Sequence, residues 1–300
     1  MQRYYILTIS ARDSCRKLKL GITSSEQSES FFEIPDKKHN FAFHKHLEYI
    51  FKHMARTYGL IGYPLGHSFS RGYFTDFFAQ QGIDAEYKNF ELPQIGDLTA
   101  VLTEETALQG FNVTIPYKQQ VFAFLDEVDD AAQAIGAVNV VKVLRDGERL
   151  RLKGYNTDVI GFGDSIHPLL QPHHTHALIL GTGGASKAVD YALRQLGLDT
   201  CFVSRTRREG VLSYDDLTPE VLSHYTVIVN TTPLGMHPKV DECPPIDYAS
   251  LTPRHLLFDV VYNPVKTRFL QLGEQAGAAI CNGMDMLIGQ ARAAWRIWSE

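Results

Sequence analysis

The sequence predicts an α/β fold with two domains, and three observations support this prediction. From residue 57 onward, short apolar runs of strand character alternate with segments of helical periodicity. In the second half the alternation becomes a regular strand–helix–strand series, which is typical of a parallel sheet. The length of 300 residues and the apolar content of 44% are enough for two hydrophobic cores.

The first half is expected to contain at least one antiparallel pair of strands. Strands are predicted over 57–63, 85–92, 110–115, 137–144 and 149–154, and helices over 70–81 and 95–103. Phe74, Phe77 and Phe78 give the first helix an apolar side, and Gly82 is expected to end it. The last two strands flank an Asp146-Gly147 pair, which predicts a hairpin because Gly readily adopts positive φ.

The second half reads as a βαβ series followed by a long helix. Strands are predicted over 177–180, 200–204, 226–230, 256–261 and 278–281, and helices over 186–196, 266–275 and 285–298. Leu287, Ala291, Ala294 and Trp298 recur at helical spacing in the last helix. This stripe is expected to pack onto the body of the protein.

Polar side chains gather at the end of one predicted strand, in the segment 110–118 (GFNVTIPYK). Asn112 and Thr114 are two residues apart, so in a strand both point to one face. Pro116 closes the strand and suits a helix start, so Lys118 is expected in the first turn of a helix, where the dipole disfavours a cation. The segment predicts a small-molecule site, and the alternative is a strand followed by a surface lysine.

The segment 181–186 (GTGGAS) lies between a predicted buried strand and a helix. This is the context of a dinucleotide-binding Rossmann fingerprint, in which glycines let the backbone approach pyrophosphate at a helix N-terminus. Ser186 replaces the third glycine of the fingerprint, and a purely structural turn is the alternative.

The end of the second Rossmann strand indicates which dinucleotide is preferred. It reads VSRTRR over 203–208, and no carboxylate appears before Glu209. NAD-binding domains usually carry an acid here for the ribose 2′-hydroxyl, whereas a guanidinium pairs well with a 2′-phosphate. The sequence therefore favours NADP(H), and an exposed arginine-rich turn is the alternative.

Four more segments occur in order along the chain: GYPLGHSFS at 62–70, IGAVN at 135–139, GYNTD at 154–158 and NGMDMLIGQA at 282–291. Together with the strand-end and glycine-rich motifs, they make the chain resemble the shikimate dehydrogenase family. The resemblance extends from about residue 57 to residue 298 and does not cover residues 1–53. It implies a substrate-binding domain of residues 54–157 plus 284–300, closed by the C-terminal helix, and a Rossmann NADP-binding domain of residues 158–283.

The resemblance also implies roles for individual residues. The substrate-binding residues implied are Ser68, Ser70 and Tyr262 for a carboxylate, and Asn112, Thr114, Asn139 and Gln290 for ring hydroxyls. Lys118 and Asp158 would be the catalytic pair. A lysine ammonium beside the carbonyl oxygen of 3-dehydroshikimate would stabilise the negative charge that grows during hydride transfer and donate the proton.

For NADP, the resemblance implies contacts along the whole cofactor. The residues implied are Gly181, Gly183, Gly184 and Ala185 at the pyrophosphate, Ser204, Arg205, Thr206 and Arg207 at the adenosine ribose phosphate, and Thr231, Thr232, Pro233, Met236, Val260, Gly283 and Met286 around the nicotinamide half. Two positions depart from the family pattern. Ser204 stands where Asn is common, and Glu209 stands where a second basic residue often follows, so Arg207 or Arg208 would substitute for it.

The reaction implied is the reversible, NADP-dependent reduction of 3-dehydroshikimate to shikimate in aromatic amino acid biosynthesis. One alternative is a quinate or aminoshikimate dehydrogenase on the same scaffold, although the Ser68, Ser70 and Thr114 hydroxyls favour shikimate. Another is a non-catalytic homologue that senses NADP or a cyclitol. The intact Lys118 and Asp158 argue against a sensor, because a sensor needs no proton-transfer pair.

Composition excludes several other classes of protein. A net charge of −5 gives no broad cationic surface for nucleic acid, and no apolar run reaches the ~20 residues of a membrane span. The four cysteines are scattered without a C-x-x-C pair, which argues against a zinc site and fits the cytoplasm. The HHTH run at 173–176 follows a proline and is expected to be a solvated turn instead of a metal site. We expect no metal, and a monomer or homodimer.

Residues 1–53 differ from the rest of the chain. They carry nine Lys and Arg against six Asp and Glu, whereas the remainder carries twenty against twenty-eight. They show no sustained strand or helix period, so this extension is expected to be dispensable or poorly ordered. The alternative is a regulatory or partner-binding arm.

A chain that begins at Met54 is therefore expected to fold and to keep its activity, since the first predicted core strand starts only after that residue. Thermal melting and steady-state kinetics of the shortened and full-length proteins check this expectation. A large fall in Tm or in kcat/KM would show that the extension belongs to the working structure.

Overall fold

The computed structural model describes residues 4–9, 18–23, 30–31, 56–66, 68–147 and 149–300. The chain divides into two compact units, residues 1–55 and residues 56–300. In the first unit, antiparallel strands line up in the order β1-β2-β3, with β1 at Tyr4–Ile9, β2 at Leu18–Thr23 and β3 at Ser30–Phe31. Residues 1–53 are expected to be dispensable or poorly ordered, and most of them lie outside the described residues.

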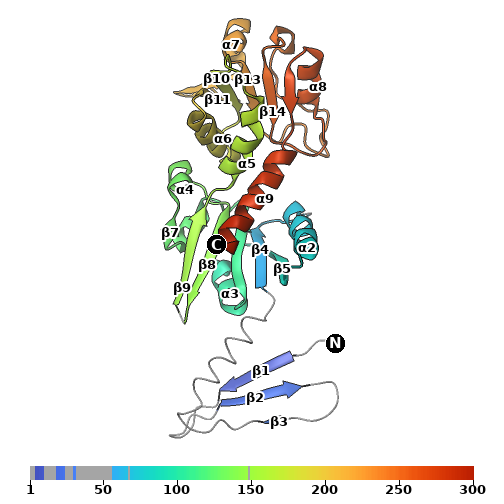
Figure 1. Ribbon diagram of the computed structural model, residues 1–300. Helices are drawn as coiled ribbons and strands as arrows, with labels where there is room; N and C mark the ends of the chain where they lie inside the picture. Colours follow the sequence, from blue (N-terminus) through green and yellow to red (C-terminus); the bar gives the residue numbers. More distant parts are fainter. Residues whose placement is uncertain (1–3, 10–17, 24–29, 32–55, 67, 148) are drawn as a thin grey trace. The chain divides into compact units, whose positions relative to one another are not determined.

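The second unit begins with a mixed sheet in the order β5-β4-β6-β8-β9-β7 (Figure 1). Its strands are β4 (Arg56–Gly62), β5 (Ala85–Glu91), β6 (Leu108–Val113), β7 (Glu127–Val128), β8 (Val140–Asp146) and β9 (Arg149–Tyr155). Strand β4 is parallel to β5 and β6, whereas β8 is antiparallel to β6 and β9. The accompanying helices are α2 (Phe69–Gln81), η1 (Ile95–Asp97), α3 (Leu98–Glu104), η2 (Gln120–Phe124) and α4 (Asp130–Ile135). The predicted antiparallel pair is thus confirmed.

Local chemistry explains the ends of these elements. The Ser68 hydroxyl accepts a hydrogen bond from the Arg71 backbone N–H at 3.3 Å and caps the start of α2. Gly82 ends α2 with φ 62°, as predicted, because only glycine adopts this conformation without strain. Gly147, with φ 59°, closes the predicted β8–β9 hairpin, in which Asp146 pairs with Arg149.

The second sheet is parallel throughout, in the order β12-β11-β10-β13-β14-β15. Its strands are β10 (His176–Leu180), β11 (Asp199–Ser204), β12 (Val211–Ser213), β13 (Val227–Asn230), β14 (Leu256–Asp259) and β15 (Ala279–Cys281). The helices around it are α5 (Asp158–Ile166), η3 (His167–Leu169), α6 (Gly184–Gln195), η4 (Tyr214–Asp216), α7 (Pro219–His224), η5 (Tyr248–Ser250) and α8 (Arg268–Gln275). Separate hydrophobic clusters cover the two faces of the sheet, so its central strands are apolar on both sides. The predicted α/β fold class is confirmed.

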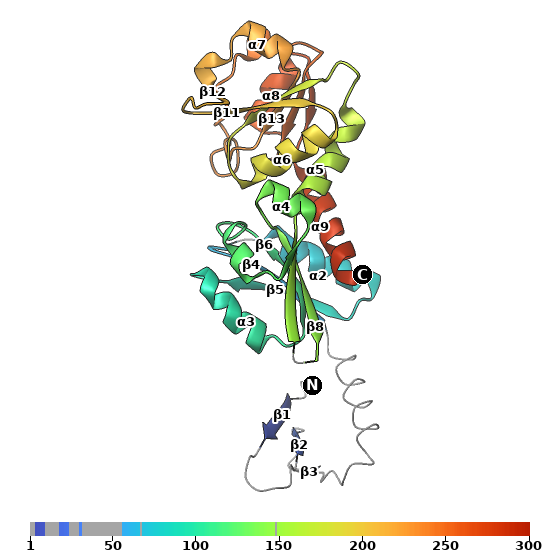
Figure 2. The same ribbon diagram turned by 90° about the vertical axis from the view of Figure 1, so that its left-hand side faces the viewer.

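The last helix, α9 (Met284–Ser299), joins the cores of the two sheets (Figures 1 and 2). Met286 belongs to a core cluster of the second sheet, whereas Ala294 and Trp298 pack with Tyr58 and Phe74 beside the first. The Trp298 indole donates a hydrogen bond to the Val141 carbonyl oxygen at 3.0 Å. The C-terminal helix therefore closes the first sheet, as the fold prediction states. In the described part of the chain, no helix combines the length and the apolar character needed to cross a bilayer.

Helices α5 and α9 cross at two glycines. A Cβ atom on Gly161 would lie 2.7 Å from the Gln290 backbone nitrogen and would also meet the Met286 carbonyl oxygen. A Cβ atom on Gly289 would lie 3.0 Å from the Gly161 Cα atom. The two backbones are therefore packed too closely for any larger residue at position 161.

One expectation for the first half is wrong. Lys118 does not lie in the first turn of a helix, because β6 ends at Val113, a turn follows, and η2 starts only at Gln120. The Lys118 carbonyl oxygen accepts a hydrogen bond from the Val138 backbone N–H at 2.8 Å. This contact ties the turn to the entry of β8, so the carbonyl is not used in a helical ladder.

Replacing Gly161 with alanine is expected to destabilise the protein by about 1–3 kcal/mol, the usual cost of overpacking a tight contact. Gly163→Ala is the matched control on the same helix, since a Cβ atom there meets nothing within 4 Å. The control should be neutral or stabilising by up to about 1 kcal/mol, because alanine favours helix more than glycine. Urea unfolding of both variants measures the difference, and equal effects would contradict the close-packing argument.

Candidate active site

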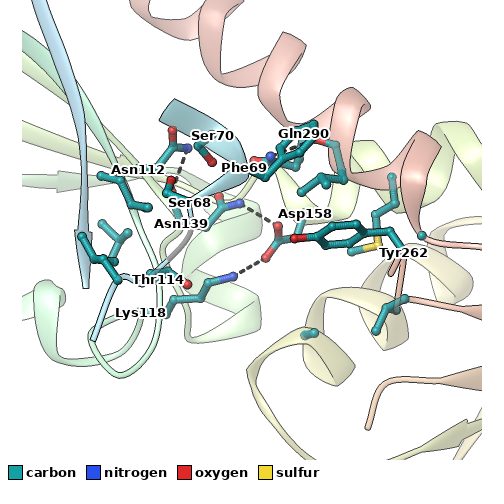
Figure 3. A pocket seen from close by; sticks show the side chains of 18 of the residues that line it. Ser68, Phe69, Ser70, Asn112, Thr114, Lys118, Asn139, Asp158, Tyr262 and Gln290 are labelled. Atoms are coloured by element: carbon teal, nitrogen blue, oxygen red, sulfur yellow. Dashed lines mark hydrogen bonds and ion pairs between the residues drawn. The ribbon is translucent and has the colours of Figure 1, made fainter. Parts of the chain in front are cut away.

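A cavity of about 400 Å³ contains every residue that was predicted to be catalytic or substrate-binding (Figure 3). These residues are Ser68, Ser70, Asn112, Thr114, Lys118, Asn139, Asp158, Tyr262 and Gln290. They come from the ends of β6 and β14 and from the starts of β8, α2 and α5, with Gln290 on α9. Elements of both sheets therefore build one site.

An ion pair lies inside this cavity. The Lys118 ammonium is 2.6 Å from Asp158 Oδ2, and their side chains are only 22% and 13% exposed. Asp158 is the first residue of α5, where the helix dipole stabilises a negative charge. Lys118 reaches it from the turn after β6, so the pair joins segments 40 residues apart.

Asn139 and Asn156 hold Asp158 in place. The Asn139 amide donates to Asp158 Oδ1 at 2.8 Å, which leaves Oδ2 for Lys118. Asn139 Oδ1 in turn accepts the Thr157 backbone N–H at 2.7 Å, and Asn156 Oδ1 accepts the Asp158 backbone N–H at 3.1 Å. Both carboxylate oxygens therefore have fixed partners. Asn156 and Thr157 were not assigned these functions from the sequence, although they adjoin Asp158 in the GYNTD motif.

The orientation of Asn112 depends on a tyrosine that the sequence analysis missed. The Tyr87 hydroxyl donates to Asn112 Oδ1 at 2.7 Å, and both side chains are buried. Burial raises the pKa of Tyr87 well above its ordinary value, so the hydroxyl remains a donor. The Asn112 amide nitrogen donates one N–H to the Asn139 backbone carbonyl oxygen at 3.4 Å, so its second N–H is the group available to a ligand. Tyr87 lies on β5, which β4 separates from β6, so no local pattern links the two residues.

The remaining polar groups of this cavity come from helices and a loop. Ser68 and Ser70 lie at the start of α2, and the ring of neighbouring Phe69 is 6.0 Å from that of Tyr262, centroid to centroid. Gln290 donates its side-chain amide to the Leu287 carbonyl oxygen at 2.9 Å. Its own carbonyl oxygen is then the group that can accept a hydrogen bond from a ligand hydroxyl.

A second cavity, of about 840 Å³, lies at the carboxyl ends of β10, β11 and β13. Gly181 has φ 110°, and a Cβ atom there would be 2.8 Å from Thr231 Oγ1. Gly183 is the N-cap of α6, and within the described residues no side chain caps this helix start. Free backbone N–H groups at a helix N-terminus suit a pyrophosphate. This cavity therefore fits a dinucleotide.

The predicted cofactor residues divide between the two cavities. Those lining the second cavity are Gly181, Gly183, Ser204, Arg205, Thr206, Thr231, Thr232 and Pro233. Those lining the first are Ala185, Val260, Gly283 and Met286. Among the described residues, neither cavity lining includes Gly184, Arg207 or Met236. Arg208, which was named only as an alternative to Arg207, lines the second cavity.

A buried carboxylate that the sequence analysis missed connects the two cavities. Asp259 has no solvent exposure and accepts hydrogen bonds from Asn230 Nδ2 at 2.9 Å, the Val261 backbone N–H at 3.0 Å and the Thr267 hydroxyl at 2.5 Å. Asn230 also accepts the Thr232 backbone N–H at 3.0 Å. Burial raises the pKa of Asp259 to about 6, because desolvation outweighs these hydrogen bonds. Its partners adjoin residues that line each cavity.

No group of three or more His, Cys, Asp or Glu side chains arranged for a metal ion occurs among the described residues. In the HHTH segment, the His173 and His174 rings each make a hydrogen bond of 3.0 Å to the Arg254 carbonyl oxygen. These two imidazoles are thus used in a loop contact.

Comparison with known proteins identifies relatives over most of the chain. Residues 60–141 match the family model described as shikimate dehydrogenase substrate binding domain. Shikimate dehydrogenase (NADP(+)) from Clostridium beijerinckii is 38% identical over 253 residues, which are 81% of this chain and 92% of that protein.

Solved structures give the same relationship. Shikimate 5-dehydrogenase from Thermus thermophilus, in complex with NADP(H) and shikimate, has a TM-score of 0.71 at 29% identity, over 81% of this chain and 93% of its own. Quinate dehydrogenase from Corynebacterium glutamicum, in complex with NAD, has a TM-score of 0.72 at 28% identity, over 82% and 94%.

The buried Asp259 predicts a distinctive pH dependence. Its pKa is about 6 in the folded protein and lower in the unfolded chain, so between about pH 4 and pH 6 the folded state binds more protons. The free energy of unfolding contributed by this group therefore falls as the pH rises through that window. Asp259→Asn should remove this pH-dependent loss of stability, because the side chain no longer titrates. Its amide oxygen can still accept from Asn230 and Val261, and its amide nitrogen can donate to the Thr267 hydroxyl.

We expect the unfolding free energy of Asp259→Asn, relative to the unmodified chain, to rise by about 3 kcal/mol between pH 4 and pH 7. Urea unfolding at a series of pH values measures this difference. The matched control is Asp164→Asn, which changes an exposed carboxylate on α5 and should leave the profile unchanged. A difference for Asp259→Asn that stays constant with pH would show that the carboxylate is charged throughout.

Proposed function

This chain belongs to the shikimate dehydrogenase family, and we propose that its two cavities together form the active site of an NADP-dependent shikimate dehydrogenase. The enzyme is an oxidoreductase that acts on a CH–OH group and takes a small-molecule substrate. In the reductive direction it converts 3-dehydroshikimate to shikimate. The chemistry is assigned from the enclosed Lys118–Asp158 ion pair, which is surrounded by hydroxyl and amide groups.

Lys118 is proposed to act on the oxygen of the reacting carbonyl. Bound NADPH supplies the hydride to the carbonyl carbon. Negative charge then grows on the oxygen, where the Lys118 ammonium stabilises it and donates the proton that completes the hydroxyl group. Asp158 holds the ammonium at 2.6 Å, and Asn139 fixes the carboxylate, so the proton donor needs little rearrangement. In the oxidative direction the same lysine accepts the proton.

The substrate carboxylate is proposed to bind the hydroxyls of Ser68, Ser70 and Tyr262. In the lining of the cavity, as far as it is described, Lys118 is the single cation, so the carboxylate is bound without a guanidinium. Hydroxyl donors give directional recognition with less charge attraction. Asn112 and Gln290 are proposed to contact ring hydroxyls, the first as a donor and the second as an acceptor.

The cofactor is NADP, and we propose that it lies across the carboxyl end of the second sheet. Gly181, Gly183 and the start of α6 would hold the pyrophosphate, and Thr231 and Thr232 would face the nicotinamide half. The φ of 110° at Gly181 and the uncapped helix start within the described residues support this fit. Arg205 on the lining provides a cation for the 2′-phosphate.

We also propose a division of the chain from residue 54 onward into two domains. Residues 54–157 plus 284–300 would form the substrate-binding domain, and residues 158–283 the Rossmann domain. The division is supported by the two sheets, whose strands fall within 56–155 and 176–281 respectively. A cytoplasmic location, a monomeric or homodimeric state and a lack of nucleic-acid or membrane partners are part of the same proposal.

Steady-state kinetics of the purified protein on shikimate and on quinate, each with NADP and with NAD, test this function directly. The highest kcat/KM is expected for shikimate with NADP. A higher value for quinate would reassign the substrate, and a lack of turnover with all four pairs would indicate a sensor.

Lys118→Ala is expected to lower kcat by about 10²–10⁴, the usual contribution of a positioned acid–base group. KM for shikimate should change much less, because the hydroxyl and amide contacts remain. The matched control is Lys88→Ala, which breaks a similar ion pair, with Glu105 at 2.9 Å, outside the cavity. The control should leave kcat unchanged. A rise in KM alone for Lys118→Ala would make Lys118 a binding residue only.

Asp158→Asn should also lower kcat, since the lysine loses the partner that positions it. The double variant Lys118→Ala/Asp158→Asn should lose less than the product of the two single losses, because the pair acts as one unit. If the double variant loses as much kcat as the product of the two single losses, the residues act independently.

A further inference from the structure

Asp259 is a buried charged group that the proposed chemistry does not use. Among the described residues it is the single Asp or Glu side chain that lies in the buried core, and it has no solvent exposure. It lines neither of the two cavities in their described parts. Burying an ionised carboxylate costs free energy, and apolar residues often serve as well in place of buried ionic groups. Stability alone therefore does not explain an aspartate at this position.

A single oxygen of Asp259 joins the ends of two neighbouring strands. Oδ1 accepts both the Asn230 side-chain amide at 2.9 Å and the Val261 backbone N–H at 3.0 Å. Asn230 ends β13, Asp259 ends β14, and the two residues pair in the parallel ladder. Oδ2 accepts the Thr267 hydroxyl at 2.5 Å, which anchors the carboxylate to the start of α8. The loops that leave the two strands are thus fixed to the same atom.

On the cofactor side, Asn230 fixes the turn that lines the 840 Å³ cavity. Its Oδ1 accepts the Thr232 backbone N–H at 3.0 Å and the Thr232 hydroxyl at 2.6 Å, and its amide nitrogen also donates to the Leu234 carbonyl oxygen at 3.4 Å. Thr232 and Leu234 both line this cavity. Because a carboxylate can only accept, Asp259 determines which end of the Asn230 amide faces the turn.

On the substrate side, Val261 lies between Val260 and Tyr262, which both line the 400 Å³ cavity, and Figure 3 shows the Tyr262 ring pointing into it. The Val261 N–H is bound by Asp259, and the Val261 carbonyl oxygen accepts the Gly283 N–H at 3.2 Å. A Cβ atom on Gly283 would lie only 2.6 Å from the Val260 carbonyl carbon. The segment that carries Tyr262 is therefore held on both sides.

We propose that Asp259 is a positioning residue for hydride transfer, which holds the turn 231–234 of the second cavity and Tyr262 of the first at a fixed spacing. The inference rests on the proposed function, since it gives a task to a residue between the two proposed ligand sites. Hydride transfer needs the donor and acceptor carbons at the correct distance, and a misplacement of about 1 Å can cost about 10²-fold in rate. A carboxylate shared by both loops keeps this spacing without contacting either ligand.

The experiment compares Asp259→Ala and Asp259→Asn in the full-length chain, by steady-state kinetics with shikimate and NADP⁺. Alanine removes both oxygens and frees Asn230 to rotate, so kcat should fall by about 10–10²-fold, the cost of misplaced reacting groups. The asparagine amide can keep all three hydrogen bonds, so Asp259→Asn should keep kcat within about twofold of the unmodified chain. KM for either ligand should change less than kcat, because Asp259 contacts neither.

His255→Ala is the matched control for stability. His255 directly precedes β14 at its opposite end, is 2% exposed, and makes a hydrogen bond of 2.9 Å from Nε2 to the Leu222 carbonyl oxygen. Its loss should lower Tm, as the loss of Asp259 does, and leave kcat unchanged. A fall in kcat confined to Asp259→Ala, together with its rescue by Asp259→Asn, separates positioning from stability.

A milder pair of variants tests the same proposal if Asp259→Ala does not fold. Thr267 and Thr218 are the N-caps of α8 and α7, and each hydroxyl accepts a backbone N–H at 3.4 Å. Valine at either position removes this cap, but only Thr267→Val also releases Asp259 Oδ2. Thr267→Val alone should therefore lower kcat, by about three- to tenfold.

An unchanged kcat in Asp259→Ala, or in Thr267→Val where the first variant does not fold, would make Asp259 a structural residue only. Equal losses in Asp259→Ala and Asp259→Asn would show that the charge matters and the hydrogen bonds do not. Either result would overturn the inference while the unmodified chain still oxidises shikimate. A lack of that turnover in the unmodified chain would contradict the proposed function instead.

Discussion

The close crossing of α5 and α9 determines where Asp158 and Gln290 lie in the first cavity. Because Gly161 and Gly289 have no side chain, the two helix backbones lie closer together than larger residues would allow. Asp158 stands at the start of α5, and Gln290 follows Gly289 on α9, so both enter the cavity from helices that are fixed against each other. A rigid scaffold of this kind holds reacting groups in position without a large entropic cost at each turnover.

Several side chains near the two cavities are held in one orientation by hydrogen bonds to other side chains. Asp158 is oriented by Asn139, and Asn112 is oriented by Tyr87. Asp259 joins segments that adjoin the linings of the two cavities. In each case a buried polar group is satisfied by another polar group, so it cannot turn to a different partner without losing a hydrogen bond. The side chains that line the cavities thus depend on other polar side chains for their orientation.

Most of the fold could be predicted from the sequence, because apolar periodicity and turn residues act within a few positions of the chain. Gly82 and the Asp146-Gly147 pair mark turns through backbone geometry alone, and both are confirmed. The prediction for Lys118 was wrong because its carbonyl bonds to Val138, a long-range contact that no strand or helix rule includes. The short elements β7, β12, α4 and α7 were not predicted, and neither was α5. The polar residues gathered in the first cavity were predicted from motif resemblance, whereas Tyr87 and Asp259 depend on strand order and burial, which appear only after folding.

The packing of α9 also affects the order in which the chain can fold during synthesis. Trp298 fills the space beside Gly110 and bonds to Val141, more than 150 residues earlier in the chain. The core beside the first sheet therefore stays incomplete until residues 284–299 have left the ribosome, although that sheet is synthesised first. On one face of the parallel sheet, the core cluster contains no residue of α9 and can pack earlier. The mixed sheet, although it is synthesised before the parallel sheet, would then be protected from proteases later.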